Sequence, residues 1–400
     1  MSQTAIYFNP WDPQFRANPY PHYKPLYGTP PRLIDMFGPT VLAARYQDVT
    51  GILRDHARFS SVQPKPPEPV EGMLDVFGGA ATMLFSDPPV HTRLRKLVMK
   101  AFTPRRVREF EPRIRQLVTI LLDKASGRGK FEVIADLATP LPVMVIAGML
   151  GVPPEQYETF KHWSDLIVEV DNTLPGQPVP DEARKANDDL RGYFADQIER
   201  RRREPGDDLV SALVAAQEEN ESLSGDELLA FVVLLLLAGN ETTTNLIGNG
   251  MLALGRNPDQ MGRLRSESSL VASGIDEMLR YDGPVQSTVR YATQDTEIDG
   301  TKIAKNTSIF VIVAAANRDP EHFPDPDRFD VARTPNDHVA FGEGIHFCIG
   351  SALARLEAAV AVEMVLERFP KLKLADPDAP VTYKGSYFLR GLRELPMSIV

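Results

Sequence analysis

Cysteine is the scarcest residue in this 400-residue chain, which contains one, Cys348. A single cysteine rules out an internal disulfide framework, and so excludes the small secreted scaffolds that disulfide bonds hold together. This usage suits a reducing cytoplasm, and we expect a soluble, cytoplasmic protein. From cysteine count alone, Cys348 is expected to be a small buried hydrophobic side chain.

Long apolar segments are also missing. The longest run, Leu228 to Gly239, has 12 residues, whereas a helix needs about 20 to cross a bilayer. We therefore expect a buried core helix there and no membrane anchor. The N-terminal segment lacks the basic and apolar regions of a signal peptide, so no secretion signal is expected.

Basic residues are outnumbered, with 44 Lys and Arg against 54 Asp and Glu and a net charge of −10. An acidic chain is poorly suited to bind a polyanion, which argues against nucleic acid as a partner. A repeat of fixed period is missing too, which excludes solenoids and propellers. The 43% of apolar residues is enough for a large core.

What is present is mainly helical periodicity, from about residue 88 to residue 285. It predicts helices over residues 105–125, 140–150, 154–170, 182–203, 207–219, 225–255 and 258–282. Asp87, followed by two prolines, is the expected N-cap of a further helix. Short strands are expected at Thr40–Ala44, Val285–Ala292, Thr307–Ala314 and Leu395–Val400. No composition change marks a linker, so the sequence predicts one domain over residues 1–400, mainly α with small β-sheets (α+β).

The segment around Cys348 has features that a buried thiol does not need. It reads Phe341-Gly342-Glu343-Gly344-Ile345-His346-Phe347-Cys348-Ile349-Gly350 and leads into an apolar helical stretch. Its three glycines allow a tight turn, and N–H groups at a helix start favour negative charge on the thiol. A lone thiolate on a stiff loop can be the axial ligand of haem iron. The alternative, a cysteine nucleophile, has a possible base in His346 but no evident third partner.

A second polar feature interrupts the long apolar run. Asn240, Glu241 and Thr242 follow Gly239 in an otherwise apolar helix, and a buried carboxylate is costly unless it is paired or used. An acid followed by a hydroxyl could relay protons to a bound ligand, and Gly239 would let a flat ligand approach the backbone. The alternatives are a polar helix edge, or threonines that bond back to helix carbonyls.

Glu277 and Arg280 are spaced i, i+3 and share one helical face. Taken alone, such a pair is usually a surface feature. It gains weight from Arg328, which offers a second guanidinium just ahead of the cysteine segment.

Four basic residues could serve one anionic ligand. His91 and Arg95, spaced i, i+4, can reach the same group, and Arg290 and His346 supply two further donors. Haem brings two propionates, and each charge-assisted hydrogen bond to them is worth about 1.5–3 kcal/mol. Each of the four could singly be a solvated charge or a satisfied core histidine.

Together these motifs resemble those of the bacterial cytochrome P450 family, the haem-thiolate monooxygenases, over essentially the full chain. The cysteine segment matches the Phe-Gly-x-Gly-x-His-x-Cys-x-Gly signature at every fixed position. The stretch from Ala238 to Thr243 is similar to the oxygen-activation motif of the family's central helix. Glu277 and Arg280 match its Glu-x-x-Arg pair, with Arg328 in the place of a third, locking arginine. The resemblance implies a triangular helical domain with a long central helix.

The resemblance also implies haem b as the cofactor, with Cys348 as its axial thiolate. Glu241 and Thr242 would deliver the protons needed for oxygen activation. The residues implied to bind the haem are His91, Arg95, Arg290, His346, Phe341, Gly342, Ala238 and Gly350. The residues implied to hold the cysteine segment are Glu277, Arg280 and Arg328.

On the opposite side of the haem the family binds substrate, and this chain offers mostly apolar residues there, as a ligand pocket requires. The candidates are Phe77, Leu234, Leu235, Val285, Thr288, Val289 and Phe388. Electrons would come from a separate ferredoxin or flavodoxin with its NAD(P)H-dependent reductase, since no flavin or iron–sulfur segment fits in the chain. The candidate docking cluster is Arg93, Lys96, Lys100, Arg105 and Arg106.

The activity implied is insertion of one oxygen atom from O2 into a hydrophobic small molecule, by C–H hydroxylation or epoxidation. A peroxygenase driven by H2O2 is an alternative, but the acid–threonine pair is typically replaced in the peroxide-using relatives. A haem-binding sensor or carrier without turnover would not need that pair. A hydrolase using Cys348 is excluded as soon as the expressed protein contains haem.

Overall fold

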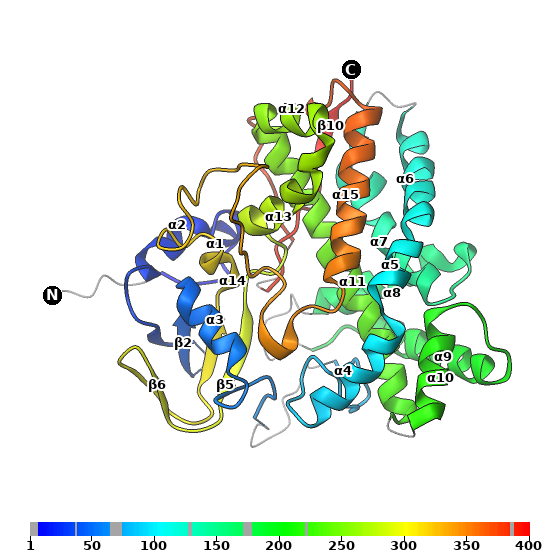
Figure 1. Cartoon of the computed structure of the whole chain (residues 1–400), viewed down its shortest axis with the longest axis horizontal. Coiled ribbons are helices and arrows are strands. Elements are labelled where there is room, and N and C mark those ends of the chain that lie inside the picture. Colours follow the sequence, from blue (N-terminus) through cyan, green and yellow to red (C-terminus); the bar gives the residue numbers. More distant parts are fainter. Residues whose placement is uncertain are drawn as a thin grey trace.

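The computed structural model describes residues 7–36, 38–64, 74–126, 130–170, 178–220, 223–384 and 388–400. Figure 1 shows a helical part, which holds the cyan, green and orange elements, beside a smaller part with the blue N-terminal elements and most of the yellow strands. The red C-terminal strand returns to the helical part. The two ends of the chain therefore belong to different parts of the fold.

Most elements are helices, and their bounds follow the apolar periodicity of the sequence. The α-helices are α1 Pro13–Ala17, α2 Tyr20–Tyr23, α3 Tyr46–Arg54, α4 Val90–Ala101, α5 Pro104–Glu109, α6 Glu111–Ser126, α7 Pro140–Met149, α8 Tyr157–Glu169, α9 Asp181–Arg203, α10 Leu209–Asn220, α11 Gly225–Arg256, α12 Pro258–Ser266, α13 Val271–Asp282, α14 Val313–Ala316 and α15 Ser351–Arg368. Short turns of other helix types are Lys24–Leu26, Ile134–Ala138, Pro154–Gln156, Ser268–Leu270 and Gly344–His346.

The strands are short and form three small sheets within the described residues. They are β1 Arg32–Asp35, β2 Pro39–Ala43, β3 Phe59–Ser60, β4 Lys130–Glu132, β5 Thr288–Ala292, β6 Thr296–Ile298, β7 Thr301–Ile303, β8 Ser308–Val311, β9 Lys373–Leu374 and β10 Pro396–Ser398. The largest sheet has the order β1-β2-β8-β5-β3, in which β2 and β8 are parallel and the other neighbours antiparallel. This sheet places β5, which carries Arg290, at the boundary with the helical part.

The long helix α11 lies at the centre of the helical part and packs against α7, α9, α13 and α15. Its start is fixed by a capping box, because Ser224 and Glu227 each bond the other's backbone N–H at 3.0 and 2.9 Å. By length and composition its 32 residues could cross a membrane, which the 12-residue run did not suggest, but 78% of its most apolar window is buried inside the protein. It has the burial of a core helix.

Several local predictions were wrong in detail. The helix predicted over residues 105–125 is two helices, α5 and α6, and the strand predicted over Val285–Ala292 begins only at Thr288. The helix predicted over residues 258–282 is two helices, α12 and α13, separated by a turn at Ser268–Leu270. The strand predicted to reach Ala314 ends at Val311, and α14 follows. Asp87 does not cap α4, because its carboxylate accepts from the Ser61 N–H at 3.1 Å instead.

Candidate active site

The cysteine segment is a tight turn that its glycines make possible. Gly342 and Gly344 have φ angles of 72° and 66°, a region that side chains disfavour. A Cβ on Gly344 would also lie 2.7 Å from the Leu53 carbonyl oxygen. The turn closes where the Cys348 N–H donates to the Phe341 carbonyl at 2.9 Å. The loop therefore has one well-defined shape, set against α3 and leading into α15.

The Cys348 side chain is exposed, and its environment acts on the thiol in two directions. Desolvation by the surrounding protein raises the pKa of Cys348, whereas the N–H groups of Gly350 and Ser351 and the charges of Arg95 and Arg355 lower it. The net shift is upward, against the bias to thiolate that we expected from the helix start. A coordinated metal cation deprotonates a thiol outright, so the N–H groups would then stabilise the sulfur charge that coordination creates.

A buried ion pair lies behind this loop. Glu277 and Arg280 of α13 are both fully buried and bond through two contacts of 2.7 and 2.8 Å. Arg280 also donates to the carbonyls of Asn317, Pro326 and Arg328 at 2.9–3.1 Å. These acceptors belong to the irregular tract before the cysteine loop, so one guanidinium fixes several turns of it.

The arginine that completes this ion pair is Arg333, not Arg328 as the sequence suggested. The Arg333 Nε donates to both Glu277 oxygens at 3.2 and 3.1 Å. The Arg328 side chain is 63% exposed and contacts Asp330 at 3.4 Å. Arg328 takes part only through its carbonyl oxygen, which accepts from both Arg280 and Arg333.

Four predicted basic residues meet beside the cysteine loop. The His91 and His346 rings lie 4.4 Å apart between centroids, and the Arg95 Nη2 donates to the Phe347 carbonyl at 2.7 Å. The positive charges of Arg290, His91 and Arg95 all lower the pKa of His346. The structure thus brings α4, β5 and the cysteine loop together.

The electrostatics of this cluster favour an anionic ligand. Burial, reinforced by the neighbouring cations, lowers the pKa of His346 to about 3. Burial lowers the pKa of Arg290 to about 10. Neither ring nitrogen of His91 makes a hydrogen bond of normal geometry within the described part of the chain. The negative charge of the Asp87 carboxylate works against the lowering of the pKa of both Arg290 and His91. This carboxylate already accepts hydrogen bonds from Ser60 and Ser61.

One stripe of the buried helix α11 is accessible. Ala238 is exposed and Thr242, one turn later, is partly exposed, whereas Leu234 and Leu235 on the preceding turn are buried. The Thr242 hydroxyl donates to the Ala238 carbonyl at 2.8 Å, which is the back-bonding alternative weighed above. Glu241 is 8% exposed. The helix is continuous through Gly239, so no break in α11 accompanies this polar stretch.

The family model for Cytochrome P450 matches residues 14–390. The chain belongs to the cytochrome P450 family. It is 42% identical over 393 residues to the cytochrome P450 monooxygenase PikC of Streptomyces venezuelae, covering 96% of this chain and 91% of PikC. It is 39% identical over 389 residues to the vitamin D(3) 25-hydroxylase of Pseudonocardia autotrophica, covering 96% of this chain and 94% of that enzyme.

Solved structures confirm the fold. The CYP109E1 structure from Bacillus megaterium in complex with testosterone superposes with a TM-score of 0.85 at 36% identity, covering 97% of this chain and 99% of that one. The mainly helical cytochrome P450 fold predicted from the motifs is therefore confirmed. As a member of this family the chain is an oxidoreductase, a haem-thiolate monooxygenase.

The residues beside Cys348 fit a haem. The thiol offers a soft ligand, and the two arginines and two histidines offer donors for two carboxylates. Phe341 and Ile349 are partly buried apolar side chains of the same loop. Sequence reasoning missed two residues of this cluster. The Ser61 hydroxyl lies 2.9 Å from the His346 Nε2. The charge of His56 lowers the pKa of both His91 and His346. Neither residue belongs to a recognisable motif, so spacing gave no signal for them.

The predicted substrate residues separate into two groups. Val285 precedes β5 and Thr288 is its first residue; both are partly buried, and Val285 forms an isolated bridge with Leu389. Val289 and Phe388 instead pack against the core of the sheet part, where Phe388 stacks on Phe310 at 6.0 Å. Strand alternation is the reason, because Thr288 and Arg290 bond to each other on one face and Val289 takes the other. Val289 is therefore partly buried against this core and lies on the face opposite to Thr288 and Arg290.

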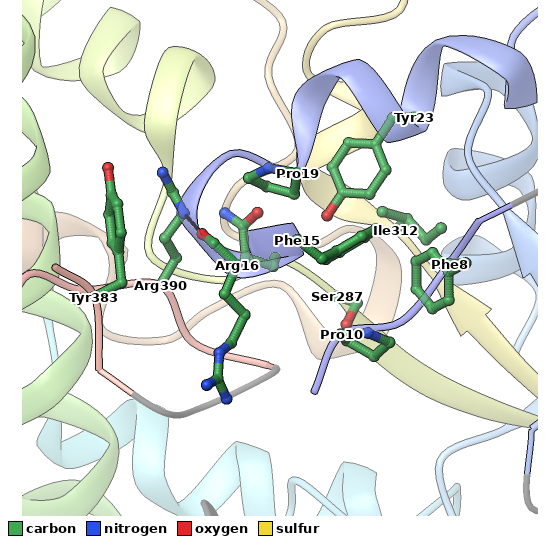
Figure 2. A pocket seen from close by; sticks show the side chains of 11 residues that line it. Phe8, Pro10, Phe15, Arg16, Pro19, Tyr23, Ser287, Ile312, Tyr383 and Arg390 are labelled. Carbon is green, nitrogen blue, oxygen red and sulfur yellow. Dashed lines mark hydrogen bonds between the residues drawn. The ribbon is translucent and has the colours of Figure 1, made fainter. Parts of the chain in front are cut away.

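Phe77 lies in the segment before α4, partly buried, with its ring 6.4 Å from that of Phe85. A separate cavity adjoins the start of β5 on the N-terminal side (Figure 2). Aromatic rings and the guanidinium groups of Arg16 and Arg390 surround it in Figure 2. Its lining residues are Phe8, Pro10, Phe15, Arg16, Pro19, Tyr23, Gln286, Ser287, Ile312, Tyr383 and Arg390.

The basic cluster proposed for docking is less positive than it seemed. Arg93 forms an ion pair with Glu227, at 3.0 Å for one contact, and Arg105 with Glu109 at 2.8 Å. Lys96 is exposed and Arg106 partly exposed. The Lys100 side chain lies outside the described residues.

Proposed function

We propose that this cytochrome P450 hydroxylates a C–H bond of a rigid, largely apolar molecule of about steroid size. The reaction consumes the substrate, O2, two electrons and two protons, and yields the alcohol and one water. The observation that carries the proposal is the exposed Cys348 thiol, held in a fixed loop whose N–H groups act on its sulfur. An ordinary structural cysteine needs neither accessibility nor such donors.

Cys348 is the proposed axial ligand, and bound haem supplies the oxidation chemistry at its iron. His91, Arg95, Arg290 and His346 would hold the propionates. Phe341, Gly342, Gly350 and Ala238 would lie against the ring. Glu277, Arg280 and Arg333 hold the loop that presents the sulfur.

Thr242 and Glu241 are the proposed proton-delivery pair. The Thr242 proton is held by the Ala238 carbonyl, so its oxygen lone pairs can accept a further hydrogen bond on the accessible stripe of α11. Glu241, the next residue, can exchange protons with solvent and pass them to that hydroxyl. This pair is the feature that favours O2 over H2O2 as the oxygen source, and turnover over mere haem binding.

The substrate class is supported by two relatives and by the lining residues. One relative is named a vitamin D(3) 25-hydroxylase, and CYP109E1 is solved with testosterone. Val285 and Thr288, which are partly buried, would contribute to the wall of the substrate site. Leu234 and Leu235 are buried in the structure and are not included in this wall. Testosterone is a rigid, largely apolar ring system that such a wall can bind without ordering a flexible chain.

The electron donor is proposed to be a separate ferredoxin or flavodoxin with its NAD(P)H-dependent reductase. Exposed basic side chains near the cysteine side, such as Lys96 and Arg106, suit an acidic protein. The family match over residues 14–390 supports one haem domain over residues 1–400. Burial of α11 supports a soluble protein, and the single cysteine suits a reducing cytoplasm.

The first test is spectroscopic. Reduced holoprotein with carbon monoxide should show the strongly red-shifted Soret band of thiolate-ligated haem, and Cys348→Ala protein should lose it. Retention of that band in Cys348→Ala would refute the ligand assignment. A ferric spin shift on adding vitamin D3 or testosterone tests the substrate class.

Turnover separates the catalytic proposals. With a reductase, ferredoxin and O2, the wild-type protein should form a hydroxylated product, and Thr242→Ala should lower the product formed per electron pair by about tenfold or more. Product only with added H2O2 would favour the peroxygenase. No product from any bound compound, with a working donor, would favour a sensor.

A further inference from the structure

Three successive turns of α11 face the segment that precedes the C-terminal strand. Glu241, Asn245 and Asn249 are spaced i, i+4 and i+8, and therefore form one stripe along the helix. We call the described residues 383–384 and 388–392 the C-terminal loop. The Asn249 amide donates to the Arg390 carbonyl of this loop at 3.0 Å.

The loop touches the helix at the next turn as well. A Cβ added to Gly391 would lie 1.8 Å from the Asn245 Oδ1, so only a glycine permits this approach. The two arms of the loop are joined, because the Lys384 N–H donates to the Gly391 carbonyl at 2.8 Å. The Arg390 guanidinium also lies 3.6 Å over the Tyr383 ring, and both side chains are drawn in Figure 2. The backbone of Lys384 is thus held at a fixed place beside α11.

At the third turn the Lys384 Nζ lies 3.9 Å from a Glu241 carboxylate oxygen. The Lys384 side chain is 31% exposed and that of Glu241 is 9% exposed. From these contacts we propose that Lys384 is a positioning residue for Glu241, which keeps this carboxylate ionised and directed toward the C-terminal loop. The proposal rests on the proton-delivery role proposed for Glu241.

The physical reason is the low exposure of the acid. A buried carboxylate favours its neutral form, and a cation within about 4–6 Å restores the charged form. Asn249 at the far end of this stripe contacts the backbones of Asp282 in α13 and Arg390 in the loop. The charged side chains of these two residues pair with each other at 2.8 Å. Because the lysine is partly exposed and flexible, the contact can open to let the carboxylate exchange a proton with water.

The same loop reaches the proposed substrate residues. Leu389 bridges to Val285, and the Gln286 N–H donates to the Phe388 carbonyl at 2.8 Å. A substrate that moves this segment would move Lys384 with it. Lys384 therefore connects the substrate side of the pocket to the proton-delivery acid.

The test variant, Lys384→Met, removes the positive charge and keeps an unbranched side chain of similar bulk. Lys384→Met should lower the product formed per electron pair by about two- to fivefold, as expected for a partly exposed ion pair. Lys384→Arg should stay within about twofold of wild type. Lys371→Met removes an exposed lysine elsewhere in the C-terminal region and should change nothing. In a Glu241→Gln background, Lys384→Met should cause no further loss.

A measurement without turnover decides the point. Infrared difference titration of holoprotein, with Glu241→Gln as the reference, reports the Glu241 carboxyl directly. Its pKa should rise by about one unit in Lys384→Met and not in Lys371→Met. An unchanged pKa, or equal coupling in the two Met variants, would overturn the role of Lys384. Failure of the parent function would look different, since the carbon monoxide band or the substrate-induced spin shift would then be missing in wild-type protein.

Discussion

The two sides of the proposed haem site are held in different ways. On the cysteine side, the fully buried Glu277 carboxylate accepts from Arg280, Arg333 and the Asp330 N–H at 2.7–3.2 Å. On the other side, Glu241 has a 3.9 Å contact with a partly exposed lysine. The difference teaches that the cysteine side is fixed by buried charges that are costly to leave unpaired. The side with Glu241 depends on a partly exposed contact that can open.

The largest effect should follow removal of the central acid. Glu277→Gln leaves two buried guanidinium groups without their carboxylate and should lower the free energy of unfolding by about 3–5 kcal/mol. The matched variant Glu241→Gln should lower it by less than about 1 kcal/mol while reducing coupling. Urea unfolding and haem content measure both. Equal losses of stability would mean that the two sides are not built differently.

Arg333 and Arg328 offer the next test, on the cysteine side alone. Arg333→Ala should cost about 2–3 kcal/mol, because it removes a donor to a buried carboxylate. Arg328→Ala should cost about 0.5 kcal/mol or less, since that side chain is 63% exposed. Thermal unfolding of the two variants compares them. A reversed order would restore Arg328 as the locking residue.

Glu357 of α15 is an exception on the well-paired side. It is 2% exposed, one of its oxygens makes no hydrogen bond within the described part of the chain, and burial raises its pKa to about 8. The folded state therefore holds this proton between about pH 4.5 and 8, where the unfolded state releases it. The stability that this proton gives is complete below the unfolded pKa and is lost as pH rises toward 8.

Glu357→Gln should remove that pH dependence. Relative to wild type, its free energy of unfolding should rise by about 1–3 kcal/mol between pH 5 and pH 8. Urea unfolding at several pH values measures the difference, and the exposed Glu367→Gln on the same helix is the control. Parallel pH profiles for Glu357→Gln and wild type would show that the acid is ionised in the folded protein.

The smallest effects should separate Val285, which precedes β5, from Val289 within the strand. Val285→Ala should weaken substrate binding by about 1 kcal/mol with little change in stability. Val289→Ala should cost about 1 kcal/mol of stability and leave substrate affinity unchanged, because Val289 packs in the sheet core. Ligand-induced spin shifts and thermal unfolding measure the two quantities. An affinity loss only in Val289→Ala would contradict the placement of Val289 against the sheet core.

Features fixed by local spacing could be predicted from the sequence. The helical fold, the run that became α11 and the family motifs around Cys348 and Glu277 all depend on residues within about ten positions of each other. Contacts over long distances could not. Arg328 and Arg333 lie in the same irregular tract, where no periodicity shows which side chain turns inward.

Lys384 and Glu241 illustrate the same limit, since they lie in separate elements and neither belongs to a shared pattern. Val289 is a different case, because the face of the strand on which it lies could have been predicted. Once Arg290 was expected to bind an anion, the two-residue period of a strand put Val289 on the opposite face. The family and its cofactor could be predicted from the sequence, but the contact between Lys384 and Glu241 could not.

Arg390 connects the start of the chain to its end. It pairs with Asp282 and donates to the carbonyls of Arg16 and Ala17, 374 and 373 residues away. During synthesis on the ribosome, the first helices can therefore make these contacts with Arg390 only after almost the whole polypeptide has been translated. The cysteine loop and its arginines are complete some forty residues earlier. A nascent chain can thus build its iron-binding side before its substrate side, and a short C-terminal truncation would remove the second while sparing the first.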